Sequence, residues 1–276
     1  MPVTLLTLYN AWNQPHTGVH CEDSQCSVPS HAVDLRNSGR MHDVYYDPKE
    51  GRIIKASAAY TRDTGQWQNE VELATWMGEL GIGPKVYESG VERAPWWPSH
   101  RRRPRGIFTM QALERTLRDV DVFTPAIVDS VVDLISRVAD MHIMYSDMKG
   151  NNIMLDDSNQ AFFIDFGDNF VIRETNVDPD VLELVMLIVL RSDMHRKRRI
   201  DLFADVLPEF PSRELRDAAI DYIAHTDRYG GANPVYVNLM RMGGFMEHDI
   251  NLMDFLNDWK RTPSLEWPLP LYKHYK

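Results

Sequence analysis

The chain has 276 residues, of which 43% are hydrophobic and 25% are charged, so it is long enough for one large domain or for two lobes. Its formal net charge of -10 argues against binding to nucleic acid or to an anionic membrane, since both need a basic surface. Only two cysteines occur, and no segment has the composition of a signal peptide or the length of a membrane span, so we expect a soluble, cytoplasmic protein.

The first part of the chain predicts an irregular extension followed by a strand-rich lobe. Residues 1–32 contain scattered prolines and polar residues without a period, and we interpret them as an N-terminal extension. The runs VDL, DVYYD and RIIKAS that follow are rich in Val, Ile and Tyr, which indicates an antiparallel meander. A helical stripe then ends at Gly81, and KVYESGVER and GIFTMQAL indicate two more strands. Residues 33–113 therefore predict a lobe of five strands and one helix.

Residues 114–276 have a mainly helical pattern. The run TPAIVDSVVDLISRVADMH indicates a helix with Thr124 as its N-cap and Pro125 in its first turn. Two short strands, NIMLDD and AFFID, are expected around the turn DSNQ, and the later helices are VLELVMLIVL, SRELRDAAIDYIAH and HDINLMDFLNDWK. A strand-rich half before a helix-rich half predicts an α+β chain in two lobes.

One stretch of the second lobe, YSDMKGNNIMLDDSNQAFFIDFGD, carries residues that favour a chemical function. Asp147, Lys149 and Asn152 fall in one turn before a strand, so a carboxylate, a cation and an amide converge. Asp165 opens an Asp-Phe-Gly sequence at the end of the neighbouring strand, where Gly167 frees the backbone. Two carboxylates and an amide suit Mg²⁺ held together with phosphate oxygens. The alternative is that Asp and Asn only fill turns, where both are favoured.

These residues resemble the catalytic loop, His-Arg-Asp-x-Lys-x-x-Asn, and the metal-binding Asp-Phe-Gly of the eukaryotic-type protein-kinase-like superfamily. The resemblance implies a bilobal fold that transfers the γ-phosphoryl group of ATP, with Mg²⁺ or Mn²⁺, to a hydroxyl, and it favours Ser or Thr of a protein as the acceptor. It implies that Asp147 orients or deprotonates this hydroxyl and that Lys149 steadies the transferred phosphate. Asn152 and Asp165 would hold the metal ion.

The resemblance extends into the first lobe. Lys55, in RIIKAS, is similar to the lysine of the third kinase strand, and Glu70 is similar to the glutamate of the kinase helix that pairs with this lysine. Glu72 is the rival of Glu70, but the two residues lie about 200° apart around a helix, so only one of them can face Lys55. We favour Glu70, because the residues after it then follow the usual apolar pattern.

The nucleotide-binding residues of the first lobe follow from the same resemblance. The span FTMQALER resembles the last strand and the hinge, with Met110 as the gatekeeper and Gln111 to Leu113 offering backbone groups to adenine. The loop that covers the phosphates should read Gly-x-Gly-x-x-Gly-x-Val, but NSGRMHDV keeps only Gly39 and Val44 of this pattern. Bulkier residues at the other positions would reshape the contact with the phosphates.

A second departure lies around the catalytic loop. Tyr145 and Ser146 replace the usual His-Arg, and the arginine is the residue that in many kinases binds a phosphorylated activation loop. Only the run DNFVIRETNVDP separates Asp-Phe-Gly from the next helix, a compact arrangement that resembles RIO-type, lipopolysaccharide-type and viral or bacterial-effector kinases. We therefore expect no activating phosphorylation, and Asp178 or Asp180 as the helix residue that braces the catalytic loop.

Two other functions stay open at this point. A small-molecule kinase of the aminoglycoside or choline type shares the two aspartates and the asparagine, but commonly lacks the lysine at Lys149. A pseudokinase that binds partners without catalysis is favoured by the degraded glycine loop. The basic runs 100–105 and 195–199 are either docking sites for an acidic partner or solvated loops, and Cys21 and Cys26 are either reduced thiols or part of a structural metal site.

Overall fold

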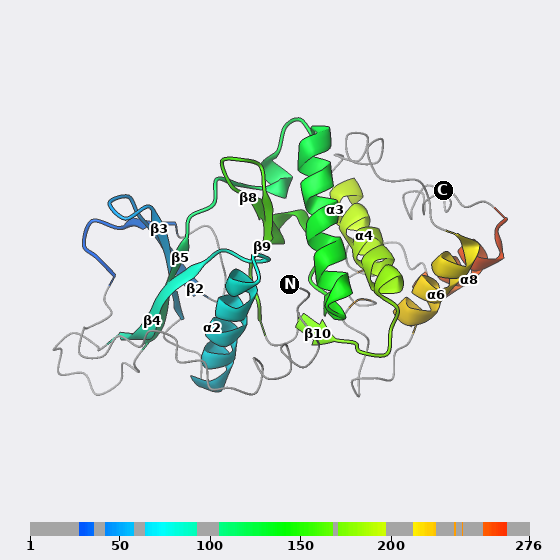
Figure 1. Cartoon of the computed structure of the whole chain (residues 1–276), viewed down its shortest axis with the longest axis horizontal. Helices are drawn as coiled ribbons and strands as arrows, with labels where there is room; N and C mark the ends of the chain where they lie inside the picture. The colour runs from blue at the N-terminus through cyan, green and yellow to red at the C-terminus, as the bar shows by residue number, and fades with distance from the viewer. Residues whose placement is uncertain are drawn as a thin grey trace, which may run out of the picture. The chain divides into compact units, whose positions relative to one another are not determined.

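The computed structural model describes residues 28–35, 42–57, 64–92, 105–167, 171–196, 212–224 and 251–263, and the single positions 235 and 239. Its contacts divide the chain into two units, Met1–Ala112 and Leu113–Lys276 (Figure 1). The described part of the first unit is a sheet with one helix, and that of the second is mainly helical, so the chain is α+β as the sequence predicts. No helix among these residues is both long and apolar enough to span a membrane.

The first unit contains a five-stranded antiparallel sheet in the order β1-β2-β3-β5-β4. Its strands are β1 (Val33–Asp34), β2 (His42–Asp47), β3 (Arg52–Ser57), β4 (Val86–Glu92) and β5 (Arg105–Gln111). The first three strands pair in sequence order, as the expected meander requires, and β5 then inserts between β3 and β4. Helix α2 (Thr64–Glu79) connects β3 to β4 and ends near Gly81, whose φ of 66° is left-handed and easily adopted by glycine.

The two faces of this sheet pack against different segments. Helix α2 lies so close to one face that a Cβ at Gly106 would stand 2.0 Å from the ring of Trp67, so only glycine fits there. Successive strand residues point to opposite faces, and the other face carries an apolar cluster. Three buried residues form this cluster and three half-buried ones pack against it: Ile54, Ala56 and Ile107, and Val28, Ala32 and Tyr45. The last residues of the expected N-terminal extension therefore pack on the sheet.

The second unit has short strands placed between helices. Its described elements are β6 (Arg115–Thr116), η1 (Leu117–Asp119), α3 (Pro125–Asp140), β7 (Ile143–Tyr145), η2 (Gly150–Asn152), β8 (Ile153–Leu155), β9 (Ala161–Phe163), β10 (Val171–Arg173), α4 (Pro179–Arg196), α6 (Arg213–Ala224) and α8 (Leu252–Arg261). The strands form two antiparallel sheets, β6-β8-β9 and β10-β7. Helices α3 and α4 lie side by side in Figure 1 and pack against each other, and α4 also packs on α6.

Helices α3 and α4 form the core that carries the loop after β7. The hydroxyl of Thr124 accepts a hydrogen bond from the amide of Ile127, so Thr124 caps α3 as the sequence predicts. Helix α3 buries one apolar stripe, whereas in α4 every residue from 184 to 190 is buried. Each fully buried aliphatic side chain contributes about 1.5–3 kcal/mol. Helix α4 is therefore packed on most of its sides.

Candidate active site

The first unit contains a buried ion pair between a strand and a helix. Nζ of Lys55, on β3, lies 2.5 Å from Oε1 of Glu70, on α2. Lys55 is 9% exposed and Glu70 is 6% exposed, so the two charges are largely removed from water and stabilise each other. Glu72 is exposed, which is the outcome expected from its angle around the helix. The structure therefore places Glu70 against Lys55.

The other predicted nucleotide-binding residues of this unit are only partly placed. Val44 pairs with Lys55 across β2 and β3, and Met110 and Gln111 end strand β5. The amide of Gln111 already donates to the carbonyl of Lys85 at 2.8 Å. Leu113, the last residue of the predicted hinge, is half-buried and belongs to the second unit. Gly39 and the rest of the predicted phosphate loop up to residue 41 lie outside the described residues.

In the second unit, the loop after β7 gathers the three predicted residues of the catalytic motif. Oδ2 of Asp147 accepts hydrogen bonds from Nζ of Lys149 at 2.6 Å and from Nδ2 of Asn152 at 2.7 Å. The 3₁₀ turn η2 brings Asn152 back to the loop. The backbone amide of Asn152 donates to the Lys149 carbonyl at 2.9 Å. Nδ2 of Asn152 also lies 3.1 Å from the Asp147 carbonyl. The three residues of the motif therefore form one hydrogen-bonded network.

Electrostatics within this network favour Asp147 as a proton acceptor. Burial raises the pKa of the Asp147 carboxyl above its ordinary value, and the nearby negative charge of Asp165 acts in the same direction. The hydrogen bonds and charge of Lys149 and the hydrogen bond of Asn152 oppose this shift. A carboxylate with a raised pKa binds a proton more readily, which is the property a general base needs. The effect of Asp165 also means that the two carboxylates are close enough to repel each other.

The backbone of Asp165 has a constrained conformation. Its φ is 67°, a left-handed value that costs energy for residues other than glycine, although Asp adopts it more readily than most. The hydroxyl of Tyr145 donates to the carbonyl of Ile164 at 2.6 Å and lies 3.2 Å from that of Asp165. The amide of Ile164 donates to the carbonyl of Asn152 at 2.9 Å. The start of the Asp-Phe-Gly segment is therefore held by hydrogen bonds to Tyr145 of β7 and, through Ile164, to Asn152 of η2.

Tyr145 has a structural role that the sequence did not reveal. Its ring is buried, stacks on Phe163 at a centroid distance of 4.6 Å, and meets Phe166 edge-on at 6.1 Å. Its hydroxyl also accepts from Nδ2 of Asn152 at 3.2 Å. Burial, with the charges of Asp147 and Asp165, raises the tyrosine pKa well above its ordinary value, so this hydroxyl stays a donor. In the sequence, Tyr145 showed only the absence of the usual histidine.

The prediction that Asp178 or Asp180 braces the loop after β7 is wrong. Asp178 and Asp180 are exposed at the start of α4, where Oδ1 of Asp178 accepts from the amide of Asp180 at 2.9 Å. The amide of Gly150 instead donates to Asp193 at 2.8 Å. Asp193 lies thirteen residues beyond Asp180 along α4, which is about 20 Å at 1.5 Å per residue. The C-terminal end of α4, and not its N-terminal end, contacts the turn η2.

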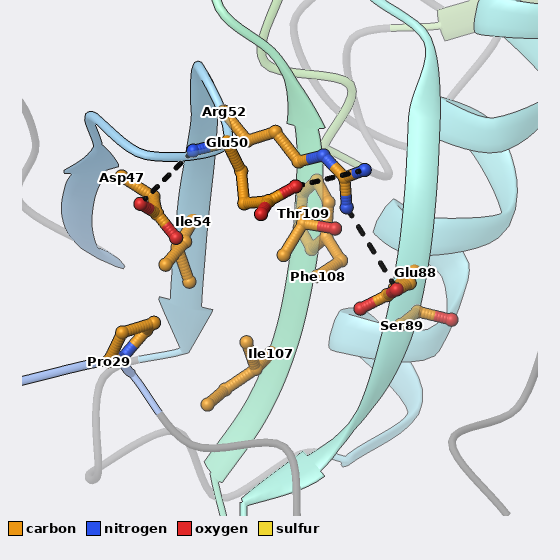
Figure 2. Close-up of a pocket in the computed structure, with 10 residues that line it drawn as sticks. All are labelled: Pro29, Asp47, Glu50, Arg52, Ile54, Glu88, Ser89, Ile107, Phe108 and Thr109. Atoms are coloured by element: carbon orange, nitrogen blue, oxygen red, sulfur yellow. Dashed lines mark hydrogen bonds and ion pairs between the residues drawn. The ribbon is translucent and has the colours of Figure 1, made fainter. Parts of the chain in front are cut away.

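A separate pocket of about 370 Å³ lies within the first unit (Figure 2). Its lining residue Ile54 is next to Lys55 on β3, so the two side chains point to opposite faces of the sheet. The charged side chains of the pocket have nearby partners. Arg52 lies 3.7 Å from Glu50 and 3.9 Å from Glu88, and Oδ1 of Asp47 accepts from the amide of Lys49 at 2.9 Å. Figure 2 shows Arg52 extended between the two glutamates. Since the pocket faces away from the Lys55 side chain, it is separate from the Lys55–Glu70 ion pair.

A scan against protein-family models and a search of curated proteins found no match to this chain. Within the described ranges, no group of three His, Cys, Asp or Glu side chains is arranged to hold a metal ion. The side chains of the two basic runs and of the N-terminal cysteines lie outside the described residues.

Proposed function

We propose that this chain is an ATP-dependent phosphotransferase with a bilobal, protein-kinase-like fold. It moves the γ-phosphoryl group of ATP, with Mg²⁺ or Mn²⁺ as the metal ion, to a hydroxyl acceptor, namely Ser or Thr of a protein. The observation that supports this proposal most is the network in which Lys149 and Asn152 both bind the carboxylate of Asp147. Tyr145 links this network to the backbone of the Asp-Phe-Gly segment.

The proposal gives each member of the network a chemical role. Asp147 accepts the proton of the acceptor hydroxyl, a role that its raised pKa favours. The side chain of Lys149 is 33% exposed, so its ammonium group can move from Asp147 to an oxygen of the transferred phosphate. Asn152 keeps the Asp147 carboxylate oriented through Nδ2.

The residues present fit a divalent cation. All three hydrogen bonds of the Asn152 side chain use Nδ2, and among the described residues its Oδ1 accepts none, so this oxygen is available as a ligand. Asp165 adds a carboxylate whose charge already affects Asp147. Mg²⁺ prefers such oxygen ligands and, when bound, would neutralise the negative charge of the phosphates. Asn152 and Asp165 are therefore the proposed metal ligands.

Lys55 and Glu70 have a supporting role in the proposal. In kinases a lysine on the third strand contacts the α- and β-phosphates, and a helix glutamate holds that lysine in place. Lys55 lies on the third strand of its sheet, and Glu70 of the following helix already forms the ion pair. The lysine side chain is therefore oriented before any nucleotide binds, which reduces the entropy lost on binding.

The acceptor is tested by incubating the pure protein with γ-labelled ATP and Mg²⁺ and a panel of acceptors. The panel contains the protein itself, generic basic and acidic proteins, an aminoglycoside and choline. We expect label on Ser or Thr of a protein. Label on a small alcohol alone would show a small-molecule kinase, against which the presence of Lys149 argues. Nucleotide binding without any transfer would show a pseudokinase.

A further inference from the structure

A buried contact joins the catalytic turn η2 to the last turn of α4 and to η1. The amide of Gly150 donates to Oδ2 of Asp193 at 2.8 Å. Asp193 is 5% exposed, and its Oδ1 lies 3.6 Å from the guanidinium of Arg118, which belongs to η1. One carboxylate therefore connects segments around residues 118, 150 and 193.

The location of Asp193 is unfavourable for an acidic residue. The C-terminal end of a helix carries a partial negative charge, which repels a carboxylate. Burial adds a desolvation penalty, which the hydrogen bond from Gly150 and the charge of Arg118 offset. Replacing a buried ion pair by apolar residues often leaves stability unchanged or raises it. Stability of the fold alone is therefore a poor reason for a charged pair at this place.

Close packing fixes the same turn from both sides. A Cβ at Gly150 would stand 2.8 Å from Sδ of Met194 and 3.4 Å from the backbone nitrogen of Arg118. Met194 is 1% exposed, so its side chain has little room to move. The backbone of η2 thus packs directly on α4 and on η1. The hydrogen bond from the Gly150 amide to Asp193 adds a directional contact to this packing.

The turn held in this way carries two residues of the proposed site. Lys149 directly precedes Gly150. Asn152 closes the turn, because its backbone amide donates to the Lys149 carbonyl at 2.9 Å. A displacement of Gly150 would move both side chains relative to Asp147, to which both are hydrogen-bonded. Misplacement of a reacting group by about 1 Å can lower a rate about 100-fold.

We propose that Asp193 and Arg118 are positioning residues, which hold η2 so that Lys149 and Asn152 meet the transferred phosphoryl group and the metal ion. This inference rests on the proposed phosphotransferase function. Neither residue contacts the acceptor in this role, because Asp193 acts through the backbone of Gly150 and Arg118 acts through Asp193. Their loss should therefore affect turnover more than the KM for ATP.

Two substitutions of Asp193 separate the hydrogen bond from the charge. Asp193→Ala removes both, and we expect turnover to fall about 10–100-fold with little change in the KM for ATP. Asp193→Asn keeps a carbonyl oxygen for the Gly150 amide, and we expect it to retain most of the turnover. Asp180→Asn, at an exposed aspartate of the same helix, is the matched control and should behave as the wild-type protein.

A second readout follows the contact itself. Hydrogen exchange of the Gly150 amide should be faster in Asp193→Ala than in Asp193→Asn or the wild-type protein. Arg118→Met should lower turnover when made alone but add little in the Asp193→Ala background, since coupled residues are non-additive. Arg137→Gln, at a half-exposed arginine of α3, is its control.

The outcomes distinguish this inference from the function on which it rests. Full turnover of Asp193→Ala, beside an active wild-type protein, would overturn the positioning role and leave the phosphotransferase proposal intact. A rise in the KM for ATP as large as the fall in turnover would also overturn it. If Asp193→Ala does not fold, Arg118→Met is compared with Asp193→Asn. Lower turnover in Arg118→Met than in Asp193→Asn supports the positioning role, and full turnover in Arg118→Met overturns it. No transfer by the wild-type protein would overturn both proposals.

Discussion

The two units hold their buried charges in different ways. In the first unit, Lys55 and Glu70 lie on regular elements and form a direct ion pair. In the second unit, Asp147 lies in a loop, and its position depends on partners that are themselves held by further hydrogen bonds. A simple pair can be replaced as a unit by apolar residues, whereas a network loses its geometry when one member is removed. The two regions should therefore respond differently to substitution.

The largest effect is expected at the centre of the network. Asp147→Ala removes the proposed base, so turnover should fall about 10²–10⁴-fold while the affinity for ATP stays nearly unchanged. Because burial raises the pKa of Asp147, turnover of the wild-type protein should fall as the pH is lowered through that raised pKa, where the carboxylate becomes protonated. The residual rate of the variant should lack this pH dependence. Loss of ATP affinity equal to the loss of rate would count against the assigned role.

Substitutions in the ion pair should affect stability and activity differently. Lys55→Met removes the positive charge with which the buried Glu70 pairs, so the free energy of unfolding should fall by about 3–5 kcal/mol and transfer should be lost. The double variant Lys55→Met with Glu70→Met should regain most of the stability but none of the activity. Urea unfolding and labelled-ATP transfer on the same preparations test this. Recovery of activity in the double variant would show that Lys55 has no role in catalysis.

A smaller effect is expected at the link between the catalytic loop and the Asp-Phe-Gly segment. Tyr145→Phe keeps the ring stacking on Phe163 but removes the hydroxyl that binds the Ile164 carbonyl. We expect the free energy of unfolding to fall by about 0.5–1.5 kcal/mol and turnover to fall by roughly tenfold or less. Tyr222→Phe, in the same unit, is the control. Unchanged turnover in Tyr145→Phe would mean that the backbone of Asp165 is held by other contacts.

The regular elements of both units could be predicted from local patterns. The cap at Thr124 and the helix end near Gly81 depend on neighbouring residues only, and the structure shows both. The choice of Glu70 over Glu72 followed from the angle between helix positions, and the structure agrees with it. The motif spacing likewise places Lys149 on Asp147, because both lie in one short turn.

Long-range contacts of the site were not accessible in the same way. Asp193 lies 43 residues from Gly150. Helix α4 is buried on most sides, so its apolar pattern does not indicate which end faces the loop, and the prediction of Asp178 or Asp180 as the brace is wrong. The hydroxyl of Tyr145 likewise binds a carbonyl 19 residues away. Such partners depend on the packing of whole elements, which no local pattern encodes.

The central claim is tested most directly by measuring γ-phosphoryl transfer for the wild-type protein and Asp165→Asn side by side, at saturating ATP and Mg²⁺. The substitution removes the charge that is proposed to hold the metal ion and changes the shape of the side chain little. The account predicts that the wild-type protein labels Ser or Thr of a protein acceptor, and that Asp165→Asn labels none although its unfolding curve is unchanged. Equal labelling by both proteins, or no labelling by a wild-type protein that binds ATP, would contradict it.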